Sequence, residues 1–64
     1  MKRGDLVRHL TKRGCQLDRE GGDHSVFYNP KTKEFSSVPR HPEIKYGTVV
    51  AICKQLGIDK PAGR

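Results

Sequence analysis

The chain has 64 residues, of which only 33% are hydrophobic. This length allows one small domain, because separate cores form only above roughly 250 residues. Thirteen Lys and Arg against seven Asp and Glu give a net charge of +6. This charge excludes an acidic disordered tail, and it makes a polyanion such as nucleic acid the first partner to consider.

The hydrophobic residues form only short runs, the longest being the five residues 49–53. A transmembrane helix needs about 20 consecutive apolar residues, and the core of a signal peptide is also longer than this run. We therefore expect a soluble, cytoplasmic protein with no membrane segment.

The two cysteines, Cys15 and Cys53, do not have CxxC spacing. Small secreted domains usually carry several disulfides, so we interpret both residues as reduced thiols in the core. A single disulfide or a pair of metal ligands remains an alternative, although no other feature of the sequence supports either.

Residues 3–13 predict an amphipathic helix, since Leu6, Val7 and Leu10 fall on one side of it. Gly14 follows where a left-handed cap is needed, and Cys15 is the apolar residue that would pack back against the helix. A helix that ends at Arg13 is therefore expected.

Three strands follow, at residues 15–20, 23–28 and 34–38. The first alternates Cys15 and Leu17 with polar residues until the Gly21–Gly22 pair. Pro39 ends the third, because proline cannot donate to a sheet ladder. The short connections predict an antiparallel meander. Alternation in the second strand separates His24, Val26 and Tyr28 from Ser25 and Phe27, and it does not decide which set is buried.

A second helix is predicted after Gly47 and Thr48, which supply a turn and an N-cap. Its apolar stripe consists of Val49, Ile52, Cys53 and Leu56, and Gly57 would end it. Residues 59–64 have no periodic apolar set, so a frayed tail is expected after a single domain over 1–58. The result is an α+β fold of order α-β-β-β-α, with both helices on one face of a three-stranded antiparallel sheet.

Histidines are the main candidates for chemistry, since the sequence contains no P-loop, GxSxG or HExxH motif and no zinc-ligand set. His24 is the most interesting, because it follows Gly21, Gly22 and Asp23 at the start of a strand, where its imidazole is expected to be accessible. An imidazole can take a proton from a ribose 2′-OH or return one to a leaving oxygen near neutral pH. A solvated, non-catalytic side chain is the competing interpretation.

Five segments, in order, resemble the HicA-type toxins, the mRNA interferases of the HicAB toxin–antitoxin systems. They cover nearly the whole chain, from Lys2 to Ile58: KxxxLxxxLxxxG at 2–14, GDH at 22–24, NP at 29–30, VPRH at 38–41 and GTxxxIxKQxGI at 47–58. The resemblance implies a fold like that of a double-stranded-RNA-binding domain, which has the same α-β-β-β-α order.

The resemblance also implies a ribonuclease whose catalytic histidine belongs to a Gly-Ser-His motif, here His24. The sequence departs from this motif, because Asp23 replaces the serine and Ser25 follows where a second histidine is common. A carboxylate near the imidazole would favour its protonated form, and therefore a general acid over a base. It would also repel phosphates, so a weakened or inactive relative is an alternative.

The predicted enzyme needs no cofactor or metal. Its partners would be mRNA and a HicB-type antitoxin that masks the active site. Three kinds of residue are expected to bind RNA: basic residues at helix ends and in loops, residues next to His24, and an aromatic residue that can stack a base. They are, in that order, Lys2, Lys12, Arg40, His41 and Lys54, then Gly22 and Asp23, and Tyr28. Two other functions remain open, a non-catalytic RNA-binding module and an antitoxin-like or adaptor protein that recognises another protein. RNA cleavage in the presence of a chelator would separate the enzyme from both.

Overall fold

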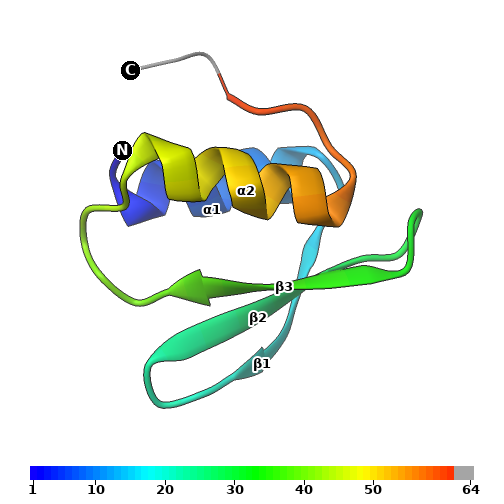
Figure 1. Cartoon of the computed structure of the whole chain (residues 1–64). Helices are drawn as coiled ribbons and strands as arrows, with labels where there is room; N and C mark the ends of the chain where they lie inside the picture. Colours follow the sequence, from blue (N-terminus) through cyan, green and yellow to red (C-terminus); the bar gives the residue numbers. More distant parts are fainter. Residues whose placement is uncertain (62–64) are drawn as a thin grey trace.

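The computed structural model describes residues 1–61 of the chain. Its elements, in chain order, are α1 (Arg3–Lys12), β1 (Gln16–Glu20), β2 (His24–Asn29), β3 (Glu34–Pro39) and α2 (Tyr46–Leu56). Both helices lie on one face of a three-stranded sheet (Figure 1). The predicted α-β-β-β-α fold is therefore confirmed.

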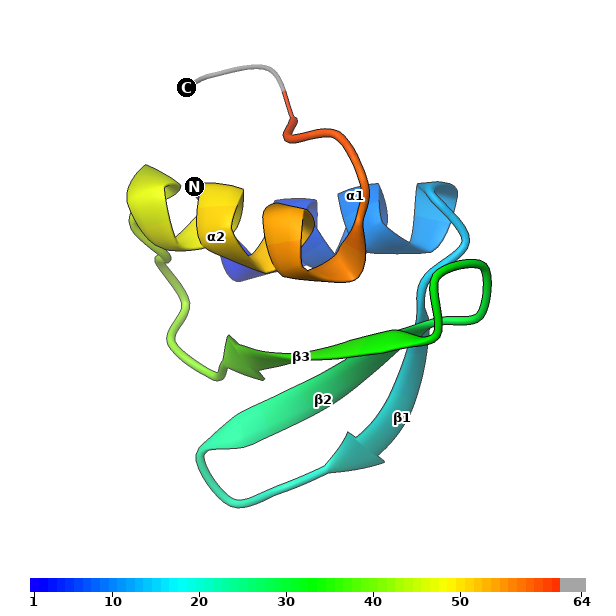
Figure 2. The ribbon, with the colours of Figure 1, turned by 45° about the vertical axis from the view of Figure 1, so that its right-hand side comes forward.

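The two helices run in the same direction (Figure 2). Near their starts, the amino group of Met1 donates to the carbonyl oxygen of Ile44 at 2.9 Å. At their ends, Gly14 and Gly57 have φ angles of 89° and 75°, the left-handed conformation expected of glycines that terminate helices. The C-terminal ends of both helices therefore lie over the same end of the sheet.

The sheet is antiparallel, with β2 in the middle. On β3, Pro39 lies opposite His24 at one end of the ladder and Phe35 lies opposite Tyr28 near the other. The register between β1 and β2 shifts between Leu17 and Arg19. Such a bulge bends a strand, and β1 indeed curves away from the helices (Figure 2).

Burial shows which face of the sheet the helices cover. In β2 the side chains of Ser25, Phe27 and Asn29 are buried, whereas His24 is exposed. The sequence did not decide which side chains of β2 are buried. In the structure Ser25 and Phe27 face the helices, whereas His24, Val26 and Tyr28 lie on the open face. The hydrophobic core consists of Leu6, Leu10, Cys15, Phe27, Val38, Ile44, Val49, Ile52, Cys53 and Leu56.

The first strand differs from its prediction. It begins at Gln16 and not at Cys15, and all of its residues are exposed. Leu17 is paired with Phe27 and so shares the helix-side face, yet it is 48% exposed. The alternation in sequence did not indicate a buried face, because α1 and α2 do not reach over the edge strand (Figure 1).

The second helix starts earlier than predicted. Lys45 is its N-cap residue and Tyr46 its first residue, so Thr48 lies inside the first turn and is not the cap. The backbone N–H of Thr48 instead donates to the carbonyl oxygen of Lys45 at 3.0 Å. The predicted stripe of Val49, Ile52, Cys53 and Leu56 is buried throughout, as expected.

The segment after α2 differs from the expected frayed tail over residues 59–61. Arg13 forms two hydrogen bonds with the Asp59 carboxylate, at 2.6 and 3.1 Å, and the ring of His9 bonds the Asp59 carbonyl oxygen at 2.8 Å. The Tyr46 hydroxyl donates to the carbonyl oxygen of Pro61 at 2.9 Å. Residues 62–64, the rest of the predicted tail, lie outside the described residues.

Both cysteines are free and buried, which confirms that they lie in the core. Burial raises the pKa of the Cys15 and Cys53 thiols, since an apolar environment disfavours the thiolate. Among residues 1–61, the structure has no helix that is long and apolar enough to cross a membrane.

Candidate active site

The turn between β1 and β2 places His24 at the surface. The backbone N–H of Gly21 donates to the carbonyl oxygen of His24 at 2.7 Å, and that of Arg40 donates to the carbonyl oxygen of Asp23 at 3.2 Å. A Cβ atom on Gly21 would lie 3.0 Å from the His24 carbonyl oxygen. The close approach therefore favours glycine at position 21, and it fixes the backbone on both sides of the exposed imidazole.

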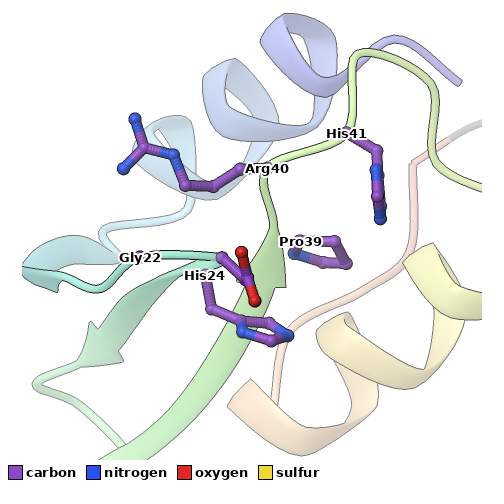
Figure 3. Close-up of a pocket in the computed structure, with 6 residues that line it drawn as sticks. Gly22, His24, Pro39, Arg40 and His41 are labelled. Carbon is purple, nitrogen blue, oxygen red and sulfur yellow. The ribbon is translucent and has the colours of Figure 1, made fainter.

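A pocket of about 430 Å³ surrounds this turn. Its lining consists of Gly22, Asp23, His24, Pro39, Arg40 and His41. Figure 3 shows His24 and His41 on either side of Pro39, and the Arg40 side chain extending away from both rings. One cavity thus contains two imidazoles, one carboxylate and the backbone of the Gly22 turn.

A chain of hydrogen bonds connects α1 to the sheet and to the pocket residue Arg40. Arg3 donates to the Ser25 hydroxyl at 2.6 Å, and this hydroxyl donates to the carboxylate of Glu20 at 2.8 Å. The same carboxylate oxygen accepts a bond from Nη1 of Arg40 at 2.8 Å. We call Arg3, Ser25, Glu20 and Arg40 the subsite network, because it connects α1 to Arg40, which lines the pocket.

The network decides what Arg40 can contribute. Its Nη1 donates to Glu20 and, at 3.3 Å, to the carbonyl oxygen of Gly21. Both bonds use one nitrogen, and a guanidinium has further N–H donors to offer a phosphate. Glu20 therefore positions Arg40 at the rim without consuming all of its donors.

The structure brings together five of the residues predicted to form the site: Gly22, Asp23, His24, Arg40 and His41. Lys2 is close to them, because it pairs with Glu43 in the loop that follows the pocket. Tyr28 shares the open face with His24, but it lies near the far end of β2.

Lys12 and Lys54 do not reach this pocket. Lys54 is in the last turn of α2, and that turn lies over the far end of β2, because Asn29 donates to the carbonyl oxygen of Leu56 at 2.7 Å. Lys12 ends α1 just before Gln16, the partner of Tyr28. Any contact of these two lysines with RNA would therefore lie away from His24.

Sequence reasoning missed the subsite network. Arg3 is not among the site residues predicted from the sequence, and Ser25 enters that prediction only as a departure from the motif. A signal for one link exists, since a hairpin closed by Gly21 and Gly22 puts Glu20 beside Ser25. The contact of Arg3 with Ser25 spans 22 positions, and no local pattern predicts it.

No three His, Cys, Asp or Glu side chains form a group that could hold a metal ion within residues 1–61.

A family model described as the HicA toxin of bacterial toxin–antitoxin systems matches residues 3–58. The chain belongs to the HicA toxin family. Searches of curated proteins and of solved structures gave no match. Membership of the HicA family implies a cognate antitoxin as partner.

Proposed function

We propose that this HicA-family chain is an endoribonuclease that cleaves mRNA, with His24 as its acid–base group. The observation that carries the proposal is the exposed His24 imidazole in a pocket shared with His41 and Arg40. A histidine is well suited to proton transfer near neutral pH, and two cationic or ionisable neighbours favour a phosphate in the same cavity.

The chemistry can be written with the residues of the pocket. His24 takes the proton of a ribose 2′-OH, the 2′ oxygen forms a bond to phosphorus, and the bond from phosphorus to the 5′ oxygen breaks. The leaving 5′ oxygen takes a proton from water, and the His24 imidazolium returns its proton to solvent. The products are a 2′,3′-cyclic phosphate and a 5′-hydroxyl end, and each step balances without a cofactor or metal.

The other pocket residues would hold the substrate. Arg40 and His41 can donate to the phosphate oxygens, and the backbone of Gly22 leaves room for the ribose-phosphate chain. Asp23 stands in the position of the motif serine, and its charge opposes a phosphate. We expect it to slow the reaction, and the HicB-type antitoxin to silence the toxin by covering this pocket.

The test is cleavage of an end-labelled single-stranded RNA by the purified chain in the presence of EDTA. The wild-type chain should release fragments with 2′,3′-cyclic phosphate ends. His24→Ala should lose between two and four orders of magnitude in rate, which is typical for a lost acid–base group. His9→Ala is the matched control, because His9 lies on α1 and bonds the carbonyl oxygen of Asp59.

Melting temperature and salt-dependent RNA binding should be almost unchanged in His24→Ala, since the exposed ring is not part of the core. Full activity in that variant would refute the assignment of His24. Binding without cleavage by the wild-type chain would favour the alternative function, a non-catalytic RNA-binding module of the same fold.

A further inference from the structure

The open face of the sheet carries an unusual set of side chains. The register places eight paired residues on it: Gln16, Arg19, His24, Val26, Tyr28, Phe35, Ser37 and Pro39. None of these eight has a carboxylate. Glu20 and Glu34 fall in the other rows, since they pair with Ser25 and Asn29, whose side chains are buried on the helix side. The carboxylates near this face are those of Asp18, the unpaired residue of the bulge, which lies 3.9 Å from Arg19, and of Asp23 in the pocket. The paired rows themselves are therefore compatible with a polyanion.

An aromatic pair lies at one end of this face. Tyr28 and Phe35 are directly opposite each other in the ladder, with ring centroids 4.6 Å apart and an interplanar angle of 38°. Phe35 is 47% exposed, although it is among the most hydrophobic side chains of the chain. Aromatic rings that are exposed on a sheet can stack unpaired bases, and stacking is worth about 1–3 kcal/mol per base.

A cation lies between the aromatic pair and His24. Arg19 pairs with Val26, which is midway between Tyr28 and His24 on β2. Its side chain is 75% exposed, and its Nε forms a long ion pair of 3.9 Å with the Asp18 carboxylate. The two Nη groups of the guanidinium can still donate to a phosphate. Three features that bind ribonucleotides thus follow one another along the face: an aromatic pair, a cation and the imidazole.

The spacing along β2 sets the length of the bound segment. Tyr28 is four positions after His24, which corresponds to about 13 Å at the rise of a β-strand. This span is longer than one nucleotide, so a base on the aromatic pair belongs to a neighbour of the cleaved nucleotide. Bases in a duplex are stacked on each other, whereas unpaired bases are free to stack on protein rings.

We propose that the open face is a binding track for single-stranded RNA, with one nucleobase stacked on Tyr28 and Phe35 and the backbone running past Arg19 to the His24 pocket. The proposal rests on the proposed ribonuclease function and adds the strandedness of the substrate and a base-binding subsite. The exposed aromatic pair, the absence of a carboxylate from the paired rows and the continuity of the face with the His24 pocket favour RNA over a protein as the occupant.

The test uses a single-stranded 2′-O-methyl RNA that contains 2-aminopurine, because this probe cannot be cleaved through a 2′-OH and its fluorescence falls when the base stacks. Wild-type protein should quench the fluorescence, and Phe35→Ala should weaken binding by about 5- to 150-fold, the equivalent of one lost stack. Phe35→Trp should restore both quenching and affinity. A duplex containing the same probe should show no added quenching.

Leu17→Ala is the matched control. Leu17 is 48% exposed and Phe35 47%, but Leu17 pairs with Phe27 and so lies on the other face. This variant removes a similar exposed apolar surface and should bind RNA like the wild-type chain. Melting temperatures of both variants show whether the fold is retained.

Two results would overturn the track. One is equal affinity and quenching for Phe35→Ala and wild type. The other is unchanged RNA binding together with a lost complex between Phe35→Ala and the cognate antitoxin, which would assign the face to a protein partner. The ribonuclease proposal is tested separately from the track. His24→Ala should quench the probe as the wild-type protein does. If the wild-type protein quenches the probe but does not cleave unmodified RNA, the enzyme proposal is refuted and the track is retained.

Discussion

The guanidinium of Arg3 donates a hydrogen bond of 2.6 Å to the hydroxyl of Ser25, and this bond connects the first turn of α1 to the residue that follows His24. Arg3 also donates to the carbonyl oxygen of Pro39 at 2.9 Å, and Pro39 is the partner of His24 in the ladder. One arginine therefore holds both the sequence neighbour and the cross-strand neighbour of the proposed catalytic residue.

Ser25→Ala should destabilise the protein. The Ser25 side chain is completely buried, and without its hydroxyl both the Arg3 guanidinium and the Glu20 carboxylate lose a partner. Arg3 is half-buried and Glu20 is exposed, so water replaces the lost hydroxyl at Glu20 and in part at Arg3. The net contribution of a hydrogen bond is about 0.5–1.5 kcal/mol, so the urea midpoint should fall by the equivalent of about one such bond. Ser37→Ala, on the exposed side of β3, is the control and should have a wild-type midpoint. Equal midpoints for the two variants would show that the network contributes nothing to stability.

The sequence predicted those parts of the fold that depend on local pattern. The stripe of Val49, Ile52, Cys53 and Leu56 recurs at helical spacing, and burial of such a stripe is what stabilises a helix in a small domain. The ends of both helices were also predictable, because the left-handed conformation that ends a helix favours glycine. The start of α2 was not predictable from Thr48, since the N-cap residue is Lys45.

The parts that depend on tertiary placement were not predictable. Alternation in β2 defined two faces, and only the positions of α1 and α2 decide that His24 is on the open one. The same placement separates Lys12 and Lys54 from the pocket, although their sequence contexts look like those of the other basic residues. Charge and motif therefore indicated residues that the fold brings together around one pocket. The sequence contained no information on how far each lysine lies from that pocket.

Asp23→Ser should accelerate RNA cleavage. Asp23 lines the pocket, and the salt bridge of Arg40 is formed with Glu20 and not with Asp23. Two unit charges 4 Å apart in water interact by about 1 kcal/mol, so removing the carboxylate should lower KM by about fivefold. The check is a comparison of KM and kcat for wild type and variant at constant ionic strength.

The control for Asp23→Ser is Asp5→Ser, which changes the net charge equally but alters the first turn of α1. An equal gain in both variants would mean that total charge, and not the pocket carboxylate, limits RNA binding. Unchanged kinetics in Asp23→Ser would contradict the proposal that this departure from the motif weakens the enzyme.

Asp59→Asn should remove a pH-dependent part of the stability. Hydrogen bonds from Arg13 lower the pKa of the Asp59 carboxyl below its ordinary value, so the pair stabilises the fold above a pH of about 3.9 and loses this contribution as the pH falls through the lowered pKa. The melting temperature of the variant should be slightly below that of the wild type at pH 7 and equal to it in strong acid. The effect should be small, since the pair is exposed. Asp18→Asn is the control, and a constant difference at all pH values would contradict the assignment.

The cognate antitoxin should protect the His24 pocket. A partner that binds only the folded toxin stabilises it by RT ln(1 + [L]/Kd), or about 2.7 kcal/mol at a hundredfold excess over Kd, so the complex should melt at a higher temperature and show no ribonuclease activity. Amide exchange should slow at Gly22, Asp23 and Arg40 in the complex. Arg40→Gln should weaken antitoxin binding more than Lys54→Gln, which removes the same charge at the far end of the sheet. Inhibition with unchanged exchange around His24 would refute masking, because the antitoxin would then act on the pocket from a distance.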